Sequence, residues 1–167
     1  CATRLARDSN AYTVEGPMGT GHRRTRPSCN HKRSIYPDAI SPHLRQRLKQ
    51  AQYGGKPKHK KNPGDFGLTP PALPYAEGTK CDDAQVTCHA QAKSLLNLAA
   101  DQGLICGRTA DADWPAMIWC VREDDEMPFE AQLENREQGV YHGYPLLADD
   151  PFRDDVLSAW REKKGKS

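Results

Sequence analysis

The sequence predicts an α+β fold, in which N-terminal helices precede a short antiparallel β-meander and a C-terminal helix follows it. Two observations predict this order. Apolar residues recur at helical spacing in the first half of the chain and again near its end. Between them lie three short segments rich in β-prone residues, separated by turn residues. The 167 residues fit a single domain. We place this α+β domain at 38–167, behind a basic, poorly ordered arm or linker at 1–37.

Each predicted helix has a recognisable start or stop. Ser41 offers a capping hydroxyl, and Pro42 suits the first position of a helix that ends before a pair of glycines. A second helix is predicted over 82–102, capped by an aspartate and stopped by Gly103. A last helix is predicted to open at 150–151, an Asp-Pro pair followed by apolar residues at packing spacing.

The strands are predicted from β-prone runs and the turns between them. Residues 117–121 are apolar, and the acidic run 123–126 is predicted to form a solvated turn. Residues 129–133 alternate between apolar and polar, which is typical of a strand with one buried face. Residues 140–144 complete the meander, and a short strand at 104–106 precedes it. The strands are grouped together between helices, and this order favours an α+β fold. The sequence contains no internal repeat.

Charge is distributed very unevenly along the chain. Residues 1–61 carry 14 Lys and Arg against three acids, a net charge of +11, whereas residues 62–167 carry a net charge of −9. Such asymmetry favours a polyanionic partner, usually nucleic acid, that is approached by the basic end. The alternative is that the basic stretch lies along the acidic half and neutralises it.

Several classes of protein are excluded by what the sequence lacks. No apolar run approaches the roughly 18 residues of a membrane span, and no leader resembles a signal peptide. We therefore expect a cytoplasmic protein, or one delivered into a target cell, and Cys1 at the start suggests a processed piece. The six cysteines are too few and too irregularly spaced for a disulfide scaffold, and they lack the closely spaced pairs that bind zinc. We therefore expect no metal and no cofactor. Cys106 and Cys120 are predicted to be small core residues.

The strongest candidate site is the loop 56–68. His59 lies among Lys56, Lys58, Lys60 and Lys61. Nearby cations favour the neutral imidazole, which can take a proton from a ribose 2′-hydroxyl while ammonium groups stabilise the phosphate. We expect His59 to be a general base, Lys56 and Lys58 to bind the phosphate and its transition state, and Lys60 and Lys61 to bind substrate. The alternative is a solvated basic loop with an inactive histidine.

A second candidate is the strand-end sequence Tyr-His-Gly-Tyr-Pro at 141–145. We expect His142 or Tyr141 to supply a second proton-transfer or positioning group, and Tyr144 to offer a surface on which a base stacks. Alternation places Tyr141 on one face of the strand and His142 and Tyr144 on the other. The alternative is ordinary packing of these rings in a half-buried sheet. Further substrate contacts are predicted from Glu130 and Gln132 on the same sheet face, Arg136 in the adjoining turn, and Arg45.

One short segment resembles a known group of proteins. Lys56-x-Lys58-His59, followed by the Asp-Phe-Gly-Leu of 65–68, resembles the active-site segment of colicin D and related toxin nucleases, in the barnase/EndoU/colicin/RelE group. Three extra residues separate His59 from Asp65, and the Ser-Gly-Trp segment of the group is absent. The resemblance implies catalytic roles for Lys56 and His59, and helices before a short antiparallel sheet. It also implies metal-independent cleavage of RNA through 2′-hydroxyl attack to a cyclic phosphate.

Together these features predict a metal-independent endoribonuclease, a bacterial toxin module that cleaves tRNA or another structured RNA. A cognate inhibitor or immunity protein is then an expected partner. The alternative is a non-catalytic module that binds nucleic acid or protein through the basic region 1–61. No P-loop, Gly-x-Ser-x-Gly or His-Glu-x-x-His motif points to another enzyme class.

Overall fold

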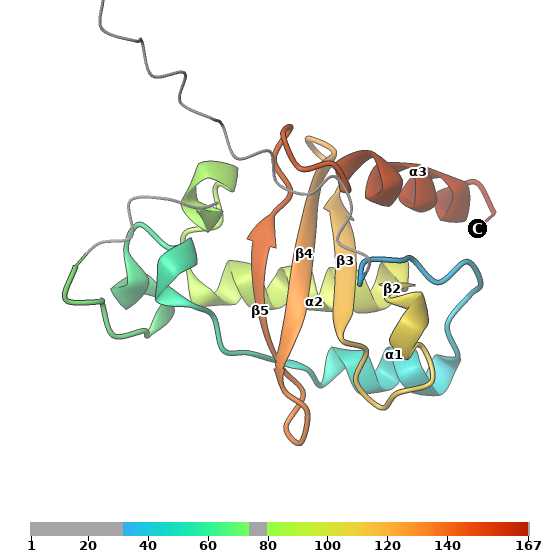
Figure 1. Cartoon of the computed structure of the whole chain (residues 1–167), viewed down its shortest axis with the longest axis horizontal. Coiled ribbons are helices and arrows are strands. Elements are labelled where there is room, and N and C mark those ends of the chain that lie inside the picture. The colour runs from blue at the N-terminus through green and yellow to red at the C-terminus, as the bar shows by residue number, and fades with distance from the viewer. Residues whose placement is uncertain (1–31, 74–79, 167) are drawn as a thin grey trace, which may run out of the picture.

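The computed structural model describes residues 32–73 and 80–166 as a five-stranded sheet with helices on both faces (Figure 1). The α+β class and the predicted order, helices first, then strands, then a C-terminal helix, are confirmed. The helices and strands are α1 (Pro42–Lys49), β1 (Gln52–Tyr53), α2 (His89–Gln102), β2 (Leu104–Ile105), β3 (Met117–Arg122), β4 (Met127–Asn135), β5 (Val140–Pro145) and α3 (Arg153–Lys164).

The sheet is mixed, which corrects the prediction of a purely antiparallel meander. Its strand order is β1-β5-β4-β3-β2. Strands β2, β3, β4 and β5 pair antiparallel with one another in chain order, as the sequence predicts. The short β1 pairs parallel with β5, with Gln52 opposite Val140 and Tyr53 opposite Tyr141. This pairing fixes the start of the loop 56–68 beside β5.

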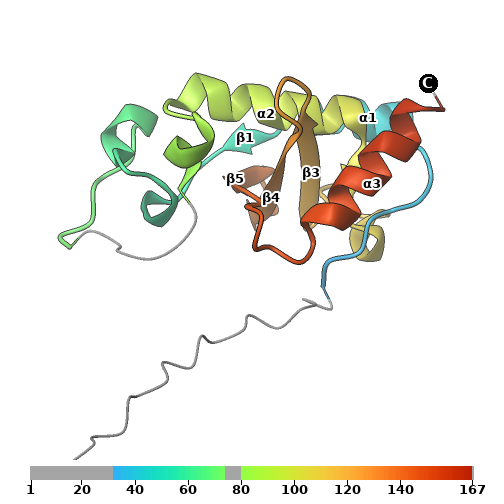
Figure 2. The same cartoon turned by 90° about the horizontal axis from the view of Figure 1, so that it is seen from above.

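The two faces of the sheet are covered differently. Helix α2 packs across one face, where Leu96 joins Ile118 and Phe129 in a single apolar cluster. Helix α3 lies on the other face (Figure 2). There Trp160 packs in a cluster with Trp119. The part of this second face over β4 and β5 carries polar side chains.

The structure confirms some of the predicted helix boundaries and corrects others. Helix α1 ends at Lys49, before the predicted stop at the glycine pair, because the chain enters β1 at Gln52. Ser41 caps α1, because its Oγ accepts a hydrogen bond from the Leu44 amide at 3.1 Å. Helix α2 ends before Gly103, whose φ of 65° is left-handed. The predicted start of this helix at residue 82 is wrong. Residues 81–84 form a separate 3-10 turn that ends at Gln85, with φ 58°, and α2 begins only at His89.

The folded unit begins before residue 38. Most of the predicted arm lies outside the described residues, but its last part packs on the domain. The Tyr36 amide donates to the Ile105 carbonyl at 2.8 Å, and Ile35 forms an isolated bridge with Cys106. Within 32–73 and 80–166, none of the helices combines the length and the apolar character that crossing a membrane requires.

Candidate functional site

Two histidines from distant parts of the sequence lie together over the polar part of the sheet. His59 ends the 3-10 turn Pro57–His59, and the proline at its first position favours the start of the turn. Its ring stacks on Tyr144, with ring centroids 4.8 Å apart, and lies 5.8 Å from the ring of His142. Only 9% of His59 and 3% of His142 is exposed. The loop and the end of β5 therefore form one site.

The register of β4 and β5 arranges the other predicted residues around these rings. Gln132 is the cross-strand partner of His142, and Glu130 is the partner of Tyr144. Residues paired in this way project from the same face of a sheet. The Tyr144 hydroxyl donates to Glu130 Oε1 at 2.6 Å, and Gln132 Nε2 lies 2.8 Å from both of these oxygens. Glu130, Gln132, His142 and Tyr144 thus share one face, as alternation predicted.

Glu130 is fully buried and serves as the acceptor at the centre of a polar network. Trp119 Nε1 donates to its Oε2 at 2.9 Å, and Arg33 Nε lies 2.8 Å from the same oxygen. Arg33 also pairs with Asp150. A buried carboxyl group needs such partners, because a polar atom left unpaired in the interior is costly. Burial, followed by the charge of Glu130, raises the pKa of Tyr144, so its hydroxyl stays protonated and acts as a donor.

Glu134 joins the site although the sequence analysis missed it. Its Oε1 lies 2.9 Å from Lys56 Nζ and 3.4 Å from His142 Nδ1. The signal was available, because Glu134 continues the alternation of Glu130 and Gln132 along β4. Placing Lys56 beside it required the fold, since 78 positions separate the two residues in the printed sequence.

The environment of His142 favours its neutral form. Burial, and then the charges of Lys56, His59, Lys58 and Lys60, lower its pKa to about 3. Removing an imidazolium from water is costly, and nearby ammonium groups add repulsion. His142 is therefore uncharged in the free protein at neutral pH.

The loop lysines have different surroundings, and one of them corrects the prediction. Lys58 is exposed, and Lys61 pairs with Asp83 of the 3-10 turn Cys81–Ala84. Lys60 was expected to bind substrate, but it is only 3% exposed and its Nζ donates to Cys81 Sγ. The cation faces inward because its ammonium lies over two aromatic rings. Lys60 is thus an interior group of the loop.

Three other predicted residues lie outside this cluster. Arg45 belongs to α1, at the opposite end of the sheet from the loop (Figures 1 and 2). Arg136 is exposed in the turn between β4 and β5. Tyr141 is fully buried on the α2 face, where its hydroxyl donates to the Pro115 carbonyl at 2.7 Å. The structure therefore gives no place in the site to Tyr141 as a proton-transfer group.

The cysteines and carboxylates of the described part of the chain form no metal-binding cluster. No group of three or more His, Cys, Asp or Glu side chains is suitably arranged there. Cys106 and Cys120 are buried in the two apolar clusters, as predicted. The polar groups gathered around His59 and His142 include the Lys56 ammonium and the Glu134 carboxylate.

We compared the chain with protein-family models, curated proteins and solved structures. No family model, no curated protein and no solved structure matches the chain.

Proposed function

We propose that this chain is a metal-independent endoribonuclease that cleaves by attack of the ribose 2′-hydroxyl. The observation that carries the proposal is the stack of His59 on Tyr144, with His142 5.8 Å away and the Lys56–Glu134 ion pair beside it. Two imidazoles this close can serve the attacking and leaving oxygens of one phosphodiester. A nearby ammonium group stabilises the charge that develops on the phosphate.

The proposed reaction uses the two rings in opposite roles. His59 takes the proton of the 2′-hydroxyl, the 2′ oxygen bonds to phosphorus, and the bond to the 5′ oxygen breaks. When the substrate binds, the His142 ring takes up a proton from water, and it then gives this proton to the leaving oxygen. The products are a 2′,3′-cyclic phosphate and a free 5′-hydroxyl. In the free protein the pKa of His142 is low because of burial and nearby cations. A bound phosphate offsets those cations, which raises this pKa and lets the ring exchange a proton.

The neighbouring residues suit a supporting role in this reaction. Lys56 is bound to Glu134 in the free protein, and its side chain is 39% exposed. Moving its ammonium group from the carboxylate to a phosphate keeps it paired and leaves Glu134 to orient His142 Nδ1. The exposed Lys58 can contact the flanking backbone of an RNA. tRNA or another structured RNA is the proposed substrate, and an inhibitor or immunity protein is a proposed partner.

The test compares single histidine variants on RNA in the presence of a chelator. His59→Ala and His142→Ala are each incubated with tRNA and an unstructured oligonucleotide, and cyclic-phosphate ends are quantified. Loss of a general acid or base lowers rates by roughly 10²–10⁴, so both variants should lose cleavage while they keep their thermal unfolding transitions. His43→Ala is the matched control, because His43 is exposed on α1.

Two results would contradict the proposal. The first is cleavage by His59→Ala at the wild-type rate. The second is RNA binding by the wild type without any cleavage. Binding that weakens steeply with salt but gives no turnover would instead favour a non-catalytic nucleic-acid-binding module.

A further inference from the structure

A buried amine and a buried thiol meet at the base of the loop 56–68. Lys60 and Cys81 are each only 3% exposed. The Lys60 Nζ lies 4.3 Å from the ring centroid of Phe66 and 5.2 Å from that of Tyr53. It donates to Cys81 Sγ, and the Cys81 thiol in turn donates to the Gly143 carbonyl at 3.3 Å. A buried lysine is costly unless it is paired. The hydrogen bond to Cys81 and the two aromatic rings therefore keep the Lys60 amine in contact with the sulfur.

The distance between the two atoms is unusually short for nitrogen and sulfur. Lys60 Nζ and Cys81 Sγ are 2.7 Å apart. Hydrogen bonds from nitrogen to the smaller oxygen atom already span about 2.7–3.2 Å. A single oxygen atom bonded to both nitrogen and sulfur holds them at about this spacing. We propose that Lys60 and Cys81 are an oxidative modification site, at which a peroxide joins the amine and the thiol through one bridging oxygen.

The chemistry of this cross-link balances with hydrogen peroxide as the oxidant. One peroxide oxidises the Cys81 thiol to sulfenic acid and is reduced to water. The Lys60 ammonium gives one proton to water and becomes a neutral amine. A second peroxide then takes one hydrogen from this amine and one from the sulfenic acid, and is reduced to two waters. A new N–O bond forms while the S–O bond is kept. In total, one amine, one thiol and two peroxides give one N–O–S bridge and three waters.

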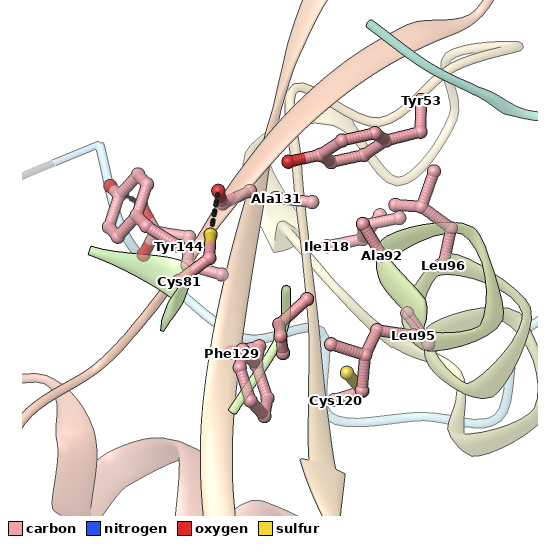
Figure 3. Close-up of a pocket in the computed structure, with 14 residues that line it drawn as sticks. Tyr53, Cys81, Ala92, Leu95, Leu96, Ile118, Cys120, Phe129, Ala131 and Tyr144 are labelled. Carbon is pink, nitrogen blue, oxygen red and sulfur yellow. Dashed lines mark hydrogen bonds between the residues drawn. The ribbon is translucent and has the colours of Figure 1, made fainter. Parts of the chain in front are cut away.

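A cavity beside Cys81 gives a small oxidant a place to reach the sulfur. Its volume is about 30 Å³, and Cys81 and Cys120 lie in its wall together with apolar side chains of α2 and the sheet. Figure 3 shows the Cys81 sulfur at the cavity, with its hydrogen bond to the Gly143 carbonyl. A cavity holds a water once about 10–15 Å³ is open to it. A peroxide, little larger than water, therefore fits next to this thiol.

The cross-link would tie two segments of the site together. Lys60 follows His59 directly, and Gly143 lies between His142 and Tyr144 on β5. The bridge would join the 3-10 turn of His59 to the turn Cys81–Ala84 and close the loop between them. A covalent link of this kind stabilises mainly by restricting the unfolded chain. The inference concerns a modification and does not depend on the proposed ribonuclease activity.

The test is peptide mapping of the full chain after treatment with hydrogen peroxide. The wild type should yield one cross-linked peptide pair containing Lys60 and Cys81, heavier than the reduced pair by about 14 Da, for one oxygen gained and two hydrogens lost. Trypsin should no longer cleave after Lys60, and a thiol reductant should restore both mass and cleavage. Burial raises the pKa of the Cys81 thiol, so the product should form faster at about pH 9 than at about pH 7.

Matched variants separate this bridge from general oxidation. Lys60→Arg keeps the cation but lacks the primary amine, so it should give no cross-link. Cys120→Ser, which alters another thiol at the same cavity, should cross-link as the wild type does. Oxidised Cys81 with normal cleavage after Lys60 would overturn the proposal. A linked pair lighter by about 2 Da, which marks a direct S–N bond, would also overturn it.

Discussion

Acidification is expected to destabilise this protein through His142. The ring is 3% exposed, and burial together with nearby cations lowers its pKa to about 3 from the ordinary 6.5. In the unfolded chain the ring regains the ordinary value. As the pH falls below 6.5, His142 therefore binds a proton in the unfolded state but stays neutral in the folded state. Stability is full above this range and is lost progressively as the pH approaches the folded-state pKa.

The size of the effect follows from that shift. One pKa unit corresponds to about 1.36 kcal/mol. At about pH 5 the unfolded ring is mostly protonated while the folded ring is not, which lowers the free energy of unfolding by about 2 kcal/mol relative to pH 8. The Glu134 side chain beside the ring is 25% exposed, and solvent at this edge weakens the effect. We therefore expect a loss of about 1–2 kcal/mol from His142 alone.

Urea unfolding at the two pH values measures this contribution. The wild type and His142→Gln are compared, because the variant keeps a polar side chain that does not titrate. The loss of unfolding free energy on acidification should be smaller in His142→Gln by about 1–2 kcal/mol. His43→Gln, at an exposed position on α1, should behave as the wild type does. Equal losses in the wild type and His142→Gln would refute the reasoning.

Two further predictions concern packing and the buried network, and both are checked by urea unfolding. Gly139 has φ 63°, and a Cβ there would lie 2.4 Å from a tryptophan ring, so Gly139→Ala should cost about 2–4 kcal/mol. Gly64→Ala, where no atom lies within 4 Å of the added carbon, should change stability by less than about 0.5 kcal/mol. Glu130→Gln removes the buried charge that faces Arg33 and should cost about 3 kcal/mol. Glu137→Gln, at an exposed position, should leave the free energy of unfolding nearly unchanged. Equal losses of stability in the two glycine variants, or in the two glutamate variants, would contradict this reasoning.

Elements with local signals were predictable from the sequence. The Ser41 cap, the Gly103 stop and the turn at 123–126 each depend on a few neighbouring residues, and the structure has all three. Strand β1 was missed because it has only two residues and its partner is β5, far along the chain. Parallel pairing leaves no local turn signature. The start of α2 was misplaced because Asp82 and Asp83 lie inside a separate 3-10 turn, whereas α2 begins at His89 without a side-chain cap.

The site was predictable to the extent that it follows strand alternation. Period-2 spacing correctly grouped His142 and Tyr144 with Glu130 and Gln132. The meeting of His59 with this group depends on where the loop after β1 lies, which the sequence does not encode locally. The burial of Lys60 could not be predicted from the sequence either, because a lysine in a polar loop is ordinarily exposed to water.

The most direct test of the central claim is the chemistry of the cleaved ends. An RNA oligonucleotide and the same sequence with 2′-deoxyribose at every position are incubated with the protein in a chelator. If His59 and His142 activate the 2′-hydroxyl, the RNA should be cut to 2′,3′-cyclic phosphates and the deoxy strand should stay intact. Cleavage of both strands, or RNA ends without a cyclic phosphate, would contradict the account.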